Sequence, residues 1–258
     1  MLAPPCILIS DIHLGHASPA VERSLVYFLR SLPGRASSLM INGDLFEFWF
    51  EWKRVVPRSS VRALAALVDL HEAGIPVTMV AGNHDCWGGE ILQEAGVAFQ
   101  LDAWTGLLGG WRARVEHGDG LREREDRGYR ALRRVLRNRM AIRAFGLVHP
   151  DLATRLAMGS SNASRSYQPR DGGRGLRSVA AAQLTAEPEL ELLVYGHSHV
   201  PALERMPGGN VYANAGSWLD RPTYLEVTPQ QVALRDWTRS AEGSNVDVIE
   251  RVTKEALA

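Results

Sequence analysis

The sequence lacks the features that mark several large classes of protein. It has only two cysteines, Cys6 and Cys86, in 258 residues, which is too few for a disulfide framework and is typical of a reducing compartment. No run of residues approaches the roughly 20 apolar side chains that a membrane-spanning helix needs, and no basic, apolar and cleavable signal pattern stands at the N-terminus. We therefore expect a soluble, cytoplasmic protein.

An excess of charge of either sign is also absent. The chain has 29 basic and 29 acidic side chains, which argues against a general nucleic-acid coat and leaves only a local basic face open. Lysine is almost missing, at positions 53 and 254 only, so nearly all positive charge is arginine. Hydrophobic residues make up 45% and charged residues 22%, an ordinary globular balance that excludes wholesale disorder.

Short apolar runs alternate with helical patterns in the first half of the chain. Strands are predicted at 6–9, 39–42, 77–81, 111–116 and 190–195, and helices at 20–31, 61–72 and 176–185. Strand and helix in turn indicate βαβ units, and hence an α/β fold with a parallel sheet. No repeat or linker divides the chain, so we expect one domain over 1–258.

The region 121–175 differs from the rest. Residues 121–158 have a helical pattern, and nine arginines against three acidic residues fall between Leu121 and Arg143. The composition of 159–175 is rich in serine, glycine and arginine and predicts a mobile loop. We interpret 121–175 as a helical insertion into the single domain.

Polar clusters recur where predicted strands end. Five of them stand out: Asp11-x-His13, Gly43-Asp44, Gly82-Asn83-His84-Asp85, His117-Gly118-Asp119 and His197-x-His199. Residues two apart at a strand end face the same side, and the carboxyl ends of strands border the ligand crevice of an open α/β sheet. The clusters can therefore converge on one site.

A single motif of this kind is usually accidental, so the distribution of histidine matters. Five of the eight histidines, at 13, 84, 117, 197 and 199, fall in the clusters. Independent accidents in this order are implausible, and only His16, His71 and His149 lie outside. Histidine, aspartate and asparagine without thiolates suit divalent ions such as Mn, Fe or Zn. The two oxygens of Asp44 could bridge two ions ~3.5–4 Å apart, as two-metal hydrolases require.

The order of these motifs, from Asp11 to His199, resembles the calcineurin-like metallophosphoesterases. The resemblance implies an α/β, four-layer αββα sandwich with a dinuclear metal site that hydrolyses phosphoesters. It implies that the first ion is held by Asp11, His13, Asp44 and His199, and the second by Asp44, Asn83, His117 and His197. It further implies that His84 neutralises developing charge and protonates the leaving oxygen. For Asp85, orientation of His84 and the capping of a turn both stay open.

Within that superfamily, "SDIHLG", "NGDLFEFW" and "HPDLATRLA" look like the UDP-2,3-diacylglucosamine pyrophosphatases of lipid A synthesis. The resemblance implies release of UMP and a diacylated sugar phosphate, with the insertion as a cap over the lipid. In that interpretation Asn162, Ser164 and Arg165 contact the glucosamine and phosphates, and Trp49 walls the acyl cavity.

Several alternatives stay open at this point. The cap helices could simply pack on the core, since amphipathic helices normally look like this. Those pyrophosphatases typically carry arginine where this chain has His84, and a substrate-binding lysine of their cap has no obvious counterpart here, so another nucleotide or phospholipid headgroup is the rival substrate. A non-catalytic metal-binding scaffold is the rival of a different class. Mn is the expected metal, with Fe, Co or Zn as alternatives, and peripheral contact with the inner membrane through the basic cap is compatible.

Overall fold

The carboxyl ends of three neighbouring parallel strands lie side by side in the larger of two sheets. In this computed structural model, the structure describes residues 1–167, 171–240 and 243–254, without the side chains of 160–167, 239–240 and 243–247. The larger sheet has seven strands in the order β12-β11-β10-β1-β2-β3-β4. Its parallel part comprises β1 (Cys6–Ile9), β2 (Ser38–Asn42), β3 (Val77–Val80) and β4 (Val97–Gln100). Its antiparallel part comprises β10 (Thr223–Val227), β11 (Gln231–Ser240) and β12 (Gly243–Thr253).

The second sheet has five strands in the order β5-β6-β7-β9-β8. These are β5 (Trp104–Leu108), β6 (Trp111–Val115), β7 (Leu192–Tyr195), β8 (Ala202–Arg205) and β9 (Val211–Asn214). Strands β6 and β7 are parallel, so their carboxyl ends also share one edge. An apolar core in which Leu8 and Met40 of the larger sheet pack with Val115 and Val194 of the smaller one joins the two sheets.

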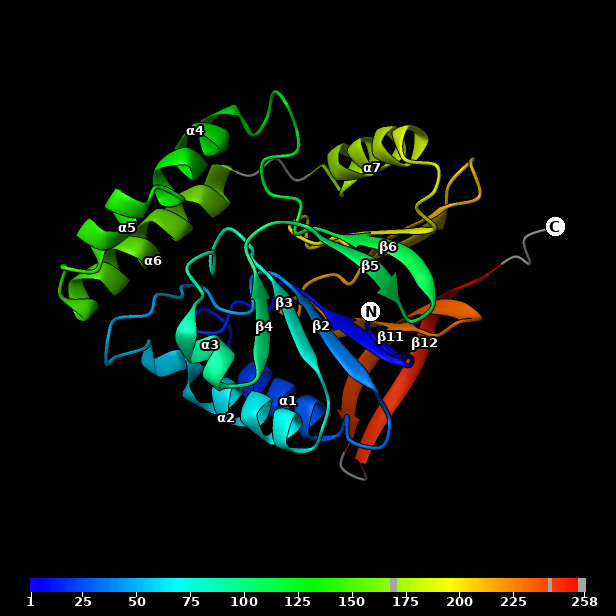
Figure 1. Ribbon diagram of the computed structural model, residues 1–258, viewed down its shortest axis with the longest axis horizontal. Coiled ribbons are helices and arrows are strands. Elements are labelled where there is room, and N and C mark those ends of the chain that lie inside the picture. Colours follow the sequence, from blue (N-terminus) through cyan, green and yellow to red (C-terminus); the bar gives the residue numbers. More distant parts are fainter. Residues whose placement is uncertain (168–170, 241–242, 255–258) are drawn as a thin grey trace.

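Helices cover the outer faces of both sheets (Figure 1). Helix α1 (Pro19–Arg30), which begins where Ser18 accepts a hydrogen bond from the Val21 amide, and helix α2 (Val61–Glu72) pack on the larger sheet. The short η1 (Arg58–Ser60) precedes α2, and α3 (Glu90–Glu94) precedes β4. Helix α7 (Arg174–Ala186) packs on the smaller sheet through Leu176, Ala180 and Leu184. The predicted α/β fold, with two sheets and flanking helices, is confirmed.

Three further helices project together beyond the sheets (Figure 1). They are α4 (Arg127–Leu136), α5 (Arg139–Phe145) and α6 (Pro150–Tyr167), and we call residues 127–167 the helical arm. The helical pattern predicted over 121–158 is confirmed only from Arg127 on, because 122–126 form a bend and turns, and it is broken where Asn138 caps α5 and where Pro150 starts α6. Within the described ranges, none of the helices has both the length and the apolar composition needed to cross a membrane.

The predicted loop at 159–175 is wrong for its first part, because α6 continues to Tyr167. Serine and asparagine cost a helix roughly 0.5 kcal/mol each and glycine about 1 kcal/mol, and no proline interrupts the segment before Pro169. Composition favoured a loop, whereas extending the helix already begun at Pro150 is easier than starting a new one.

Candidate metal centre

The five polar clusters follow five strands that end at the same place in the molecule. Asp11 and His13 follow β1, Asp44 follows β2, and Asn83 and His84 follow β3, while His117 follows β6 and the pair His197 and His199 follows β7. Parallel pairing within each sheet aligns these ends, and the core between the sheets brings the two edges together. The predicted convergence is therefore a property of the topology.

The backbone at this edge is strained at the predicted ligands themselves. In the described residues, the non-glycine positions with positive φ are Asp11, His13, Asp44, His197 and His199, with φ between 52° and 60°. Such conformations cost about 1–3 kcal/mol each and persist where the surroundings enforce them, typically at functional sites. All five belong to the set that the sequence predicts to bind metal.

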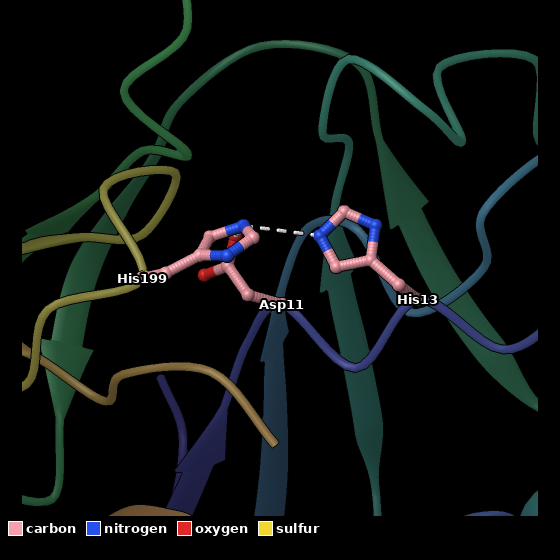
Figure 2. Close-up of side chains that lie close together, drawn as sticks. All are labelled: Asp11, His13 and His199. Atoms are coloured by element: carbon pink, nitrogen blue, oxygen red, sulfur yellow. Dashed lines mark hydrogen bonds and ion pairs between the residues drawn. The ribbon is translucent and has the colours of Figure 1, made fainter. Parts of the chain in front are cut away.

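The first half of the site contains Asp11, His13 and His199 (Figure 2). The rings of His13 and His199 face each other, with 3.1 Å between their Nε2 atoms. The Asp11 carboxylate lies beside them, its Oδ1 3.4 Å from Nε2 of His199. Three ligand atoms from two strand ends of different sheets thus share one small space.

The second half contains Asp44, His117 and His197. Oδ2 of Asp44 lies 3.1 Å from Nε2 of His117 and 3.8 Å from Nε2 of His13, so this carboxylate stands between the two halves. Its role as a bridging ligand stays a prediction, and this place between the halves is the one that role requires. Asn83 follows β3 next to His84, and both line one cavity.

Each ring whose Nδ1 contact is described turns that atom outward to a protein oxygen. Nδ1 of His117 is 2.8 Å from the main-chain oxygen of Asn42, and Nδ1 of His13 is 3.0 Å from Oε2 of Glu47. A carbonyl or carboxylate oxygen can only accept, so Nδ1 carries the hydrogen and Nε2 keeps its lone pair for the site. Metal-binding histidines in proteins are oriented in this way.

Burial and neighbouring charges shift the pKa values of these groups. Burial lowers the pKa of His197 to about 4, so its imidazole is neutral near pH 7, the form that binds a metal. Burial, together with the nearby carboxylate of Asp44, raises the pKa of Asp11 to about 6. For His117 burial acts downward, but the carboxylate of Asp44 outweighs it and raises the pKa of that ring well above its usual range. Two neighbouring buried carboxylates are stabilised by cations between or beside them.

Two buried polar atoms in the site lack a well-aligned hydrogen bond. They are Oδ1 of Asn83 and Nε2 of His117, the latter although Oδ2 of Asp44 lies 3.1 Å away. A buried polar atom without a partner is costly, and both atoms are donors of electron pairs that a metal ion accepts. The ion pairs described for Asp11 and Asp44 are all with histidines, so no arginine or lysine of the described residues neutralises them. The residues present fit divalent cations.

Gly43 allows the strand ends to approach this closely. It has φ of +76°, and a Cβ added to it would lie 2.4 Å from Nδ1 of His117 and 2.7 Å from the Cα of Gly82. Any side chain here would push the β2 and β3 loops apart and displace a ligand. Gly43 therefore allows Asp44, the next residue, to take its place in the site.

His84 lies at the mouth of the site with its ring held in place. Its Nδ1 is 2.9 Å from the main-chain oxygen of Glu47, its Nε2 is 4.0 Å from Oδ2 of Asp44, and its side chain is 12% exposed. Asp85 was open to two roles, orientation of this ring and capping of a turn. Its carboxylate accepts hydrogen bonds from the amides of Leu45, Phe46 and Gly82 and binds the β2 loop to the β3 loop. These bonds are the ones expected of a turn cap.

The residues predicted to contact the rest of a substrate have different outcomes in the structure. Trp49 is fully buried, stacks on Phe46 and belongs to the core beneath the larger sheet, so the expectation that it walls a cavity is wrong. Its large apolar ring is more stable in that core than at a ligand surface. The side chains of Asn162, Ser164 and Arg165 lie outside the described residues, so their roles stay a prediction.

A cavity of about 370 Å³ adjoins the site beneath the helical arm. Glu47, Asn83 and His84 line it at the end next to the predicted ligands. Apolar side chains line the remainder, among them Phe48, Trp87, Leu132, Val135, Leu136, Phe145 and Leu156. Trp87 and Glu47 were not predicted from the sequence. The only signal was their position, because both lie within five residues of a predicted ligand.

Comparison with known proteins agrees with this geometry. The model of the calcineurin-like phosphoesterase family matches residues 4–201. The chain belongs to this family. It is therefore a metal-dependent phosphoesterase, which confirms the predicted class of activity.

Several relatives carry one name. A UDP-2,3-diacylglucosamine hydrolase from Stutzerimonas stutzeri (strain A1501) is 35% identical over 93% of this chain and 94% of that protein. One from Porphyromonas gingivalis (strain ATCC BAA-308 / W83) is 32% identical over 74% of this chain and 81% of that protein. Among solved structures, Vacuolar Protein Sorting 29 from Cryptosporidium parvum aligns over 96% of this chain and 97% of that chain, with 14% identity and a TM-score of 0.47.

Proposed function

We propose that the protein hydrolyses the pyrophosphate bond of UDP-2,3-diacylglucosamine, releasing UMP and 2,3-diacylglucosamine 1-phosphate in lipid A biosynthesis. The observation that carries this proposal is the apolar cavity of about 370 Å³ that opens directly beside Asn83 and His84. A polar, metal-binding end and an apolar wall suit a molecule with a pyrophosphate at one end and acyl chains at the other. The shared name of the relatives supports the same substrate.

The helical arm supplies most of the apolar wall. Leu132, Val135 and Leu136 come from α4, and Phe145 and Leu156 from α5 and α6. Each buried methylene of an acyl chain contributes about 0.8 kcal/mol, so a chain in this cavity adds several kcal/mol to binding. The arm thus serves as the predicted cap, and it accounts for the insertion at about 121–175.

In this proposal the predicted ligands hold two divalent ions, with Mn as the expected metal. Asp11, His13, Asp44 and His199 surround the first position, and Asp44, Asn83, His117 and His197 the second. When bound, such ions polarise phosphoryl oxygens and acidify water. The protein contributes the placement: neutral Nε2 atoms and carboxylates converge on the site. The Glu47 main-chain oxygen holds the Nδ1 hydrogen of His84, so a second proton is taken up at Nε2, at the cavity mouth, and from there it can pass to the leaving oxygen.

The outer surface of the arm suits contact with a membrane. Leu147 is 90% exposed and Met140 70% exposed, and α4 and α5 are rich in arginine. Apolar side chains among arginines can insert at the surface of an anionic bilayer while the guanidinium groups pair with headgroup phosphates. We propose that the arm contacts the cytoplasmic face of the inner membrane, where a diacylated substrate resides.

A substrate comparison tests the proposal. We expect purified protein in Mn²⁺ to cleave UDP-2,3-diacylglucosamine at least about 100-fold faster, in kcat/KM, than UDP-glucosamine without acyl chains, because the cavity binds the chains. Release of UMP is measured for both substrates, with mononucleotides and bis-ester reporters beside them. The Asp44→Ala variant is the control and should be inactive on all.

Two outcomes would contradict it. Equal rates with and without acyl chains would remove the acyl-binding role of the cavity. Cleavage of the small nucleotide or bis-ester compounds alone would keep the phosphoesterase activity but assign it a different substrate. That rival is reasonable because this chain has His84 where the pyrophosphatases typically carry arginine.

A further inference from the structure

Glu47 contacts two histidines of the site through two different groups. Its side-chain Oε2 lies 3.0 Å from Nδ1 of His13, and both side chains are nearly inaccessible to solvent, with 2% and 1% exposed. Its main-chain oxygen lies 2.9 Å from Nδ1 of His84. One residue on the loop after β2 therefore holds a ring from the β1 loop and a ring from the β3 loop.

The loop that carries Glu47 is itself fixed. The Glu47 amide donates to the Leu14 oxygen, and Leu14 and Phe46 form an isolated β-bridge. On its other side, the Leu45 and Phe46 amides donate to the buried carboxylate of Asp85. The loop is thus bonded to both of its neighbours, so the position of the Glu47 carboxylate follows from the main chain.

Both contacts have the same chemical consequence. An oxygen acceptor at Nδ1 places the hydrogen there and leaves Nε2 as the electron-pair donor that faces the site. Nε2 of His13 then points at His199 and Asp44, and Nε2 of His84 at Asp44 from the cavity side. The carboxylate also makes the His13 ring a stronger electron-pair donor, because it attracts the Nδ1 hydrogen.

We propose that Glu47 is a positioning residue that sets the affinity of the His13 side of the site for its ion. This inference rests on the proposed metal-binding role of the cluster and not on the identity of the substrate. The two contacts are separable: substitution of the side chain removes the bond to His13 and keeps the main-chain bond to His84. Loss of the carboxylate should therefore weaken metal binding at one of two positions and leave the acid–base group in place.

The test is titration of metal-stripped protein with Mn²⁺ by calorimetry, which needs no substrate. We expect Glu47→Gln, which keeps the shape of the side chain, to weaken one of two binding events about 10-fold, and Glu47→Ala up to about 100-fold. The second event should keep its wild-type affinity. If Glu47→Ala does not fold, the isosteric Gln variant still decides the question.

Glu51→Gln is the matched control. Glu51 lies on the same loop but accepts hydrogen bonds from the amides of Gly89, Ile91 and Leu92, away from the histidines. It should bind Mn²⁺ as the wild type does, even if it melts at a lower temperature. Wild-type Mn²⁺ affinity in both Glu47 variants, or an equal loss in Glu51→Gln, would overturn the proposal. A different substrate would leave these titrations unaffected.

Discussion

The role of each residue in this site depends on which of its two nitrogens or oxygens faces inward. Main-chain oxygens of Asn42 and Glu47 accept from Nδ1 of His117 and His84, and a carbonyl oxygen cannot titrate or rotate away. In their neutral form these rings carry the hydrogen on Nδ1, because the acceptor beside that atom is a main-chain oxygen. The orientation of these rings therefore depends on main-chain oxygens, which stay in place when the side chain of Asn42 or Glu47 is substituted.

His84 is the residue whose role is easiest to isolate. We expect His84→Ala to lower kcat about 10²- to 10⁴-fold, because a positioned proton donor is lost, while both ions stay bound. Activity and metal content, the latter by mass spectrometry, are measured together, with exposed His16→Ala as the control. His84 also lies within reach of His13 and Asp44 as a potential ligand. Loss of an ion from the variant would assign it that structural role instead.

The sequence was sufficient to predict which residues meet, but not every contact they make. Ligands such as Asp11 and His197 could be found because strand-end motifs recur and topology aligns strand ends. Glu47 was not predicted, because the sequence "NGDLFEFW" does not indicate which polar side chain points toward the site. Trp49 was misplaced for a related reason, since an apolar loop residue can face either a cavity or the core. Those choices depend on packing between segments that lie far apart in the chain.

At the scale of elements, the helical arm is held by a few specific bonds. Trp87 Nε1 donates to the Leu136 oxygen at the end of α4, over 2.7 Å, and Trp52 Nε1 donates to the Val148 oxygen between α5 and α6. Phe48 and Phe50 pack with Phe145 beneath them. The arm's position, and hence the cavity's shape, depends on these aromatic residues of the β2 and β3 loops.

Removal of the hydrogen bond between Trp87 and Leu136 should change substrate binding more than it changes the rate of the chemical step. We expect Trp87→Phe to raise KM for the acylated substrate about 3- to 10-fold with kcat little changed, because about 1 kcal/mol of hydrogen bonding to the arm is lost and the ring is retained. Trp111→Phe is the control, since its Nε1 donates to Thr228 far along the chain from the arm. Equal kinetics in Trp87→Phe and wild type would show that this bond does not set the cavity.

At the scale of the whole molecule, the site exists only when both sheets are assembled. His13 and His199 are 186 residues apart in sequence, and His117 joins them from a third strand end. Order along the chain predicted the strands and the polar ends, whereas the packing of one sheet on the other follows from cores such as that of Leu8 and Val194. The site and the fold should therefore be lost together on unfolding.

This coupling predicts that metal stabilises the folded protein. Asp44 raises the pKa of buried Asp11, the ion pairs described for both carboxylates are with histidines only, and the unfolded chain has no such site. An ion at 100 times its Kd stabilises the native state by about 2.7 kcal/mol, which corresponds to a rise in Tm of about 5–10 °C for a chain of this length. Scanning calorimetry with Mn²⁺ and with chelator measures the difference, and Asp44→Ala should abolish it. The same Tm in Mn²⁺ and in chelator would mean that the cluster binds no ion in the native state, since an ion that binds only the folded chain must stabilise it.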